Sequence, residues 1–85
     1  MDPVDDFSFN VFPNPFDQFV NIEFNQAHSG YAELFSSDGR LVGIRSYIET
    51  EKVILDMPNI ISGLYFLRVT SLGGPQQTVK VIKVN

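Results

Sequence analysis

Few residues of this chain have side chains that could do chemistry. His28 is the only histidine, and it lies in the polar run Asn25–Gly30, which is expected to form a turn. A catalytic or metal-binding histidine needs partner groups, and none is apparent in this run. Asp2, Asp5 and Asp6 could meet a calcium ion, but they lack the spacing of a known calcium loop and lie on a terminus expected to fray. The sequence therefore predicts no enzyme, no cofactor and no metal site.

The composition narrows the class of protein. The chain has 85 residues, which is one domain, and 44% of them are hydrophobic, which is enough for a packed core. The formal net charge is −4 and no basic stripe is visible, so the chain is not expected to bind nucleic acid. It has no cysteine, which excludes disulfides. No apolar run approaches the roughly 20 residues of a membrane-spanning helix, so no membrane span is expected.

Apolar residues alternate with polar ones along most of the chain, which is the pattern of half-buried strands. In the run 42–48, for example, Val42, Ile44 and Ile48 form the expected apolar face. Similar runs predict about seven short strands, at residues 9–12, 20–24, 31–35, 42–48, 53–57, 65–69 and 78–84. Short strands with turn signals every 8–12 residues favour a small immunoglobulin-like sandwich of about seven antiparallel strands in two sheets.

Glycine and proline mark the expected turns. Asp38-Gly39 predicts a two-residue hairpin with a positive φ at Gly39. The run 72–75 is expected to close the last hairpin, and the run 58–63 to form a longer connection. The Pro13-Asn14-Pro15 segment lacks proline N–H donors, so it is expected to break the ladder and let the chain pass from one sheet to the other.

Two groups of residues have more than one interpretation. Five phenylalanines crowd the first part of the chain, where a core is the favoured interpretation and a sugar-binding aromatic platform is the other. They are Phe7, Phe9, Phe12, Phe16 and Phe19. Lys80 and Lys83 would either guard an edge strand against aggregation or belong to a recognised tail. The physical pattern does not separate these two roles.

Four motifs occur in a fixed order and carry a resemblance. They are FPNPF (12–16), LFSSDGRLV (34–42), MPNIISGLYFLRV (57–69) and VKVIKVN (79–85). Together they resemble the type A C-terminal sorting domain of the type IX secretion system of Bacteroidetes. Ser36 and Ser37 stand where that family often has an acid, and Ile61 stands where proline or another small residue is common. These departures are minor.

The resemblance implies a non-catalytic secretion signal at the end of a cargo protein. Such a domain crosses the periplasm, meets the type IX translocon and outer-membrane shuttle proteins, and is removed by a sortase-like cysteine peptidase. The cargo, upstream in the same chain, is then secreted or held at the outer-membrane surface. Residues 1–8 are expected to be a linker or an expression remnant, and residues 9–85 the sorting domain.

The motif residues are the candidates for recognition. They are Pro13, Asn14, Pro15, Asp38, Gly39, Arg40, Gly63, Tyr65, Lys80 and Lys83. Tyr65 is expected in the core, Gly63 is expected to allow close entry into a strand, and Asn14 is expected to bond the backbone near the kink. Arg40 would bridge to an acid or meet the translocon. The alternative function is a carbohydrate-binding or adhesive β-sandwich module of an extracellular enzyme, which an exposed coplanar row of aromatic rings would favour.

Overall fold

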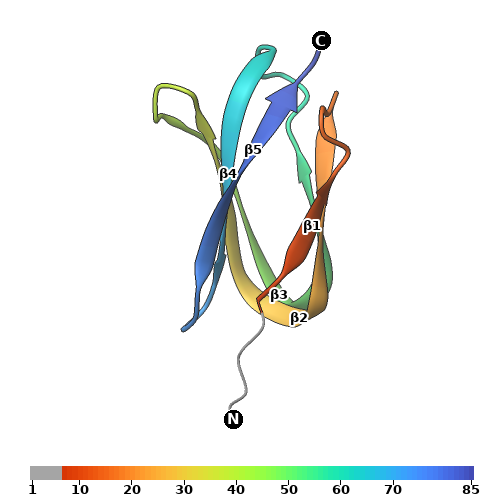
Figure 1. The fold of residues 1–85 in the computed structure, drawn as a ribbon, viewed down its shortest axis with the longest axis vertical. Helices are drawn as coiled ribbons and strands as arrows, with labels where there is room; N and C mark the ends of the chain where they lie inside the picture. Colours follow the sequence, from red (N-terminus) through yellow and green to blue (C-terminus); the bar gives the residue numbers. More distant parts are fainter. Residues whose placement is uncertain (1–6) are drawn as a thin grey trace.

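The computed structural model describes residues 7–85, and over these residues the protein is a five-stranded antiparallel β-sheet (Figure 1). The strands are β1 (Phe9–Phe12), β2 (Phe19–Ser36), β3 (Leu41–Asp56), β4 (Gly63–Ser71) and β5 (Gln76–Lys83). The all-β prediction is confirmed. Within the described residues, no helix is long and apolar enough to cross a membrane.

The number of strands differs from the seven expected because two strands are long and bent. The expected runs 20–24 and 31–35 both lie in β2, and the runs 42–48 and 53–57 both lie in β3. The polar run Asn25–Gly30 is therefore part of β2 rather than a turn. It contains a bulge, because β2 advances from Glu23 to His28 while its partner β3 advances only from Lys52 to Thr50. A bulge bends a strand without ending its ladder.

The sheet curls over so that its two halves face each other, and it is a single sheet rather than the expected pair of sheets. β2 pairs with β1 through its first half, with β4 through its second half and with β3 along both. β5 pairs with β4. The curl brings the chain after β1 to the free side of β5, where Phe16 and Lys83 form a parallel bridge (Figure 1). The Pro13-Asn14-Pro15 segment thus carries the chain across the curl.

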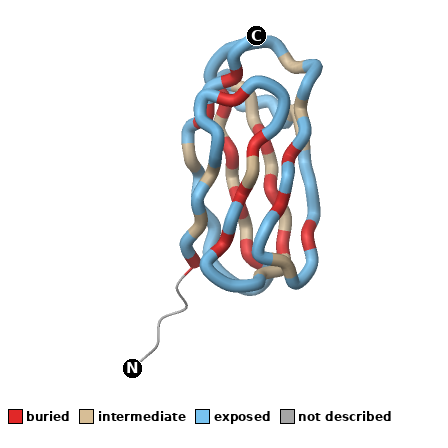
Figure 2. Tube along the Cα trace, turned by 90° about the vertical axis from the view of Figure 1, so that its right-hand side faces the viewer, coloured by how far each residue is buried: buried red, intermediate tan, exposed pale blue. Residues whose placement is uncertain are grey.

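The core fills the space inside the curl. Buried residues recur along the strands, alternating with exposed ones over most of their length (Figure 2). The buried hydrophobic residues are Phe7, Phe16, Val20, Ile22, Phe24, Ala32, Leu34, Tyr47, Val53, Leu55, Tyr65, Leu67, Val69 and Val81. In the runs 20–24, 31–35, 53–55 and 65–69 every second residue is buried, as the alternation of apolar residues predicts.

Of the apolar face expected for the run 42–48, only Val42 packs against the core, and beyond it the first half of β3 turns its opposite face inward. Ile44 and Ile48 are exposed, whereas Tyr47 is buried. Tyr47 lies opposite Gly30 of β2, and because glycine has no side chain the phenol ring can lie across it. The Tyr47 hydroxyl donates a hydrogen bond to the carbonyl of Thr70 on β4, at 2.8 Å. Burial raises the pKa of Tyr47 to about 12.

The last hairpin closes as expected. In the loop between β4 and β5, the N–H of Gly74 donates to the carbonyl of Ser71 at 2.9 Å. The N–H of Ser71 donates to the carbonyl of Pro75 at 3.0 Å. Gly73 has a φ of 70°, which is the left-handed region that glycine adopts without a steric penalty. β3 and β4 are joined by the longer connection, residues 57–62.

Candidate functional site

The Pro13-Asn14-Pro15 segment is fastened to the free edge of β5 by the Asn14 side chain. The Asn14 amide nitrogen donates to the carbonyl of Lys80 at 3.0 Å, and the amide oxygen accepts from the N–H of Ile82 at 3.0 Å. An asparagine side chain carries one donor group and one acceptor, as a peptide unit does. It therefore replaces ladder bonds that the flanking prolines cannot make. Both X–Pro bonds of the segment, Phe12–Pro13 and Asn14–Pro15, are cis.

The backbone continues this pairing beyond Asn14. The N–H of Phe16 donates to the carbonyl of Ile82 at 2.8 Å, and the N–H of Val84 donates to the carbonyl of Phe16 at 2.8 Å. The Phe16 ring is buried in the core, whereas Phe12 and Phe19 on either side are more than a third exposed. We call the bonds made by Asn14 and Phe16 to β5 and Val84 the clasp. It joins the first and last motifs of the sequence.

The two lysines of the last motif have different environments. Lys80 points outward and is exposed. Lys83 points inward and is only 1% exposed, and its ammonium donates to the carbonyls of Val84 and Asn85, both at 3.2 Å. An edge guard must face solvent, so that interpretation does not hold for Lys83. Its bonds instead hold the residues that follow β5.

The third motif lies beside the clasp. Gly63 begins β4 and pairs with Lys83, and its φ is 145°. No atom lies within 4 Å of a side chain added at Gly63, so its backbone conformation, rather than the expected close entry, calls for glycine. Tyr65 is buried as expected, pairs with Val81, and donates from its hydroxyl to the carbonyl of Ile61 at 2.6 Å.

The second motif forms the hairpin between β2 and β3. The N–H of Gly39 donates to the carbonyl of Ser36 at 2.9 Å, and the N–H of Ser36 donates to the carbonyl of Arg40 at 2.8 Å. Residues 37–40 lie between β2 and β3, so the loop is longer than the two residues expected. The hydrogen bond from the Ser36 hydroxyl lowers the pKa of the Asp38 carboxyl, and the positive charge of Arg40 acts in the same direction. The exposed Arg40 contributes its backbone to the turn.

Gly39 has a φ of 91°, which confirms the expected positive value. We expect Gly39→Ala to lower the free energy of unfolding by about 1 kcal/mol, because no atom lies within 4 Å of the added carbon and only backbone strain remains. Gly39→Asn is the control, since asparagine tolerates this region better than alanine. Chemical denaturation of the two variants measures the difference. Equal denaturation midpoints for Gly39→Ala and the parent would show that the backbone at residue 39 is not strained by a side chain.

All four motifs meet at the end of the sheet that carries the C-terminus (Figure 1). Ser36 of the hairpin pairs with Tyr65, Tyr65 pairs with Val81, and the clasp holds Ile82 on the same strand. These contacts connect segments that are far apart in the sequence. The resulting site is a set of backbone and side-chain bonds, with the side chains of Arg40 and Lys80 exposed on its surface.

His28 has a packing role in the structure. Its ring lies 4.9 Å from that of Phe7 and 5.4 Å from that of Phe24, measured between centroids. Its Nδ1 lies 3.3 Å from the hydroxyl oxygen of Ser71, and its buried Nε2 has no hydrogen-bond partner among residues 7–85. Within residues 7–85, no cluster of three or more His, Cys, Asp or Glu side chains could hold a metal ion. Asp2, Asp5 and Asp6, considered for calcium, lie outside the described residues.

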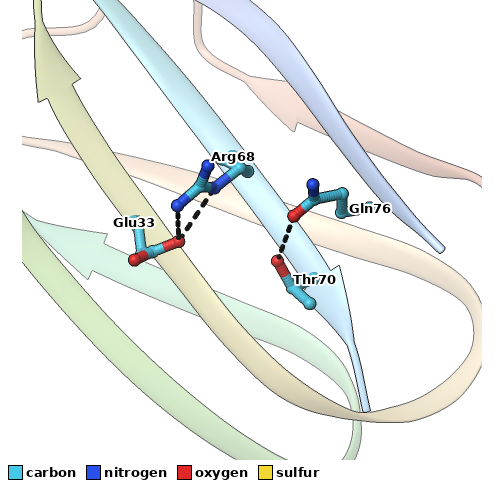
Figure 3. Close-up of polar contacts among 4 residues, drawn as sticks. All are labelled: Glu33, Arg68, Thr70 and Gln76. Atoms are coloured by element: carbon cyan, nitrogen blue, oxygen red, sulfur yellow. Dashed lines mark hydrogen bonds and ion pairs between the residues drawn. The ribbon is translucent and has the colours of Figure 1, made fainter. Parts of the chain in front are cut away.

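The outward face of β2 and β4 holds a polar network whose residues are not among the candidates for recognition. Arg68 bonds Glu33 through two nitrogens, with Nη2 and Nε at 2.9 and 3.0 Å from the same carboxylate oxygen (Figure 3). The guanidinium also lies 4.9 Å from the centre of the Phe35 ring. Next to it, the Thr70 hydroxyl donates to the Gln76 side chain at 3.3 Å (Figure 3). The alternation of residues 31–35 and 65–69 was the sequence signal that could have located this face.

A comparison with protein-family models identifies one family. The model described as the secretion system C-terminal sorting domain matches residues 10–84. This range includes all four motifs except Asn85, the last residue of the fourth motif. Searches among curated proteins and among solved structures gave no match.

Proposed function

Because the chain belongs to the family of secretion system C-terminal sorting domains, we propose that it directs an attached cargo protein across the outer membrane through the type IX secretion system. Domains of this family act as sorting signals and are generally non-catalytic. The observation that carries the proposal is the family match over residues 10–84, whose motifs meet at one end of the fold.

The signal is a folded surface rather than a linear peptide. The clasp bonds the first motif to the free edge of β5, whose other edge pairs with β4, so the first and last motifs are presented together. Asn14, Gly39, Gly63, Tyr65 and Lys83 act by shaping this end of the domain. Lys80 and Arg40, which are exposed, are available for contact with the translocon and its outer-membrane shuttle proteins.

Later steps follow from the role of a sorting signal. Residues 1–8 connect the cargo to a sorting domain at 9–85, and a sortase-like cysteine peptidase separates the two after transit through the periplasm. The cargo then reaches the cell surface or the medium. The domain itself contributes no catalytic group to these steps.

The carbohydrate-binding alternative needs rings that face solvent together. Of the five phenylalanines that suggested it, Phe7 and Phe16 are buried in the core, Phe9 packs against it, and two, Phe12 and Phe19, are more than a third exposed. On the outward face, the Arg68 guanidinium lies over the ring of Phe35. A sugar platform is therefore the less favoured function.

The proposal is tested by fusing residues 1–85 to the C-terminus of a periplasmic reporter in a bacterium with a type IX system. We expect the reporter outside the cell in the parent strain and in the periplasm of a strain that lacks the translocon. A fusion that lacks residues 79–85 should remain in the periplasm of both strains. Reporter export that does not depend on the translocon would refute the proposal.

A further inference from the structure

We propose that the outward face of β4 and β5 beside the clasp docks an apolar, carboxylate-bearing surface of a partner protein. We call this the docking face, and it consists of Leu64, Phe66, Lys80 and Ile82. The inference rests on the proposed function, because the partner belongs to the secretion machinery. It specifies which side chains of the domain the partner contacts and which chemical groups the partner must carry.

The docking face is a compact block of four side chains. Leu64 pairs with Ile82 and Phe66 pairs with Lys80 across β4 and β5, so all four project from the same side of the sheet. Leu64 is 39% exposed and Ile82 is 46% exposed. Phe66 continues the apolar surface toward Phe35, its partner on β2. Covering such side chains with a partner removes apolar area from water, which favours association.

The charge on the docking face determines the kind of partner. The chain has a net charge of −4, yet the titratable group in this block is the cation Lys80. The carboxylate on the neighbouring part of the face, Glu33, is already bonded twice by Arg68. Within residues 7–85, no carboxylate lies within ion-pair distance of the Lys80 ammonium. A partner that offers a carboxylate to Lys80 gains both attraction and orientation.

The clasp both fixes this face and limits how a partner can bind. The bonds from Asn14 hold the backbone of Lys80 and Ile82, so these two side chains are presented in a set orientation. The same bonds occupy the free edge of β5 at this point. A partner cannot add a strand there, and it must instead bind across the face of the sheet.

A second copy of the domain fits the docking face poorly. In a symmetric dimer centred on this block, the same patch meets itself, so Lys80 would approach its equivalent. Like charges placed together disfavour association. The charge therefore favours a different, acidic protein over self-association.

Two pairs of matched substitutions test the docking face in the reporter fusion. Ile82→Ser is compared with Ile54→Ser, because Ile54 on β3 has the same side chain and is 45% exposed. Lys80→Glu is compared with Lys52→Glu, an exposed lysine that is also on β3. We expect Ile82→Ser and Lys80→Glu each to reduce export by about tenfold, the scale of one lost interface contact. The β3 variants and Lys80→Arg should be exported like the parent.

Chemical denaturation of the purified domains separates docking from folding. The midpoints of Ile82→Ser and Ile54→Ser should agree, since both sites are exposed to the same degree. If the parent is exported and the docking-face variants are exported equally well, the docking face is wrong while the sorting function stands. If the parent itself is not exported by the translocon, the sorting function fails first.

Two measurements on the purified domain test whether the docking face binds a second copy of the domain or an anionic membrane instead. The parent should be a monomer in size-exclusion chromatography with light scattering. It should not sediment with phosphatidylglycerol vesicles. A dimer that Ile82→Ser disrupts would assign the face to self-association and overturn the proposal. Vesicle binding that Lys80→Glu abolishes would assign it to an anionic membrane and overturn it as well.

Discussion

Gly30→Ala is expected to lower the free energy of unfolding by about 3 kcal/mol, at the upper end of the range for overpacked interiors. A side-chain carbon added at Gly30 would overlap the backbone carbonyl of Thr70 and lie 3.0 Å from the Tyr47 hydroxyl. Gly30 is paired with Tyr47 on one side and with Ser71 on the other, so it cannot move away without breaking a ladder. The substitution also removes the hydrogen bond from the Tyr47 hydroxyl to the Thr70 carbonyl.

Thermal unfolding should show this loss as a decrease of more than about 10 °C in the midpoint for a domain of this size. Gly43→Ala is the matched control, because it also adds a methyl group to a strand glycine. There the added carbon meets only the end of the flexible Met57 side chain, which can rotate. We expect a change within about 0.5 kcal/mol for this control. Equal losses at both positions would show that the Thr70 carbonyl is not the cause.

The side-chain pattern was sufficient to place most of the core. Ile22 lies between Asn21 and Glu23 and is buried, and Val20 and Phe24, two positions to either side of it, are buried as well. Alternation reports burial directly because successive side chains of a strand point to opposite faces. Asp38-Gly39 located the hairpin and its positive φ for a similarly local reason, since a turn depends on a few consecutive residues.

Gly30 and Tyr47 show what the pattern could not provide. The burial of Tyr47 depends on the empty position opposite it on another strand, and that pairing is not visible in either local sequence. The polar run around Gly30 resembles a turn, yet it continues as a bulged strand because β3 bends beside it. The bend in β3 is marked by Glu49, whose φ is 44° and whose N–H donates to the hydroxyl oxygen of Ser29 at 2.8 Å.

The motifs identified the residues of the site, but they did not predict which of these residues are bonded to one another. The sequence identified Asn14 and the last motif separately, and it expected Asn14 to bond backbone near its own kink. The structure places its partners, Lys80 and Ile82, 66 and 68 residues away. Such contacts depend on the curl of the whole sheet. The inward direction of Lys83 could not be inferred for the same reason, since a lysine in an apolar run usually faces solvent.

Asn14→Ala is expected to lower the free energy of unfolding by about 2 kcal/mol, because two hydrogen bonds of about 1 kcal/mol each are removed. Both flanking prolines remain, so the backbone of the segment keeps its restricted φ values. If Asn14 acts only through the clasp, export of a fused reporter should fall in proportion to the fraction of unfolded domain. An Asn14→Ala domain that melts like the parent yet stays in the periplasm would assign the side chain to recognition.

Asn14→Asp separates the two bonds of the clasp. The carboxylate keeps an acceptor for the N–H of Ile82, but it places a second oxygen against the carbonyl of Lys80 in place of a donor. Below about pH 4 the carboxyl is protonated and can donate to that carbonyl again. We therefore expect Asn14→Asp to be less stable than Asn14→Ala at pH 7 and more stable at pH 3, measured by urea denaturation of both variants. An unchanged order between the two pH values would mean that Lys80 does not need a donor from residue 14, and that the clasp depends on the Ile82 bond and the Phe16 backbone alone.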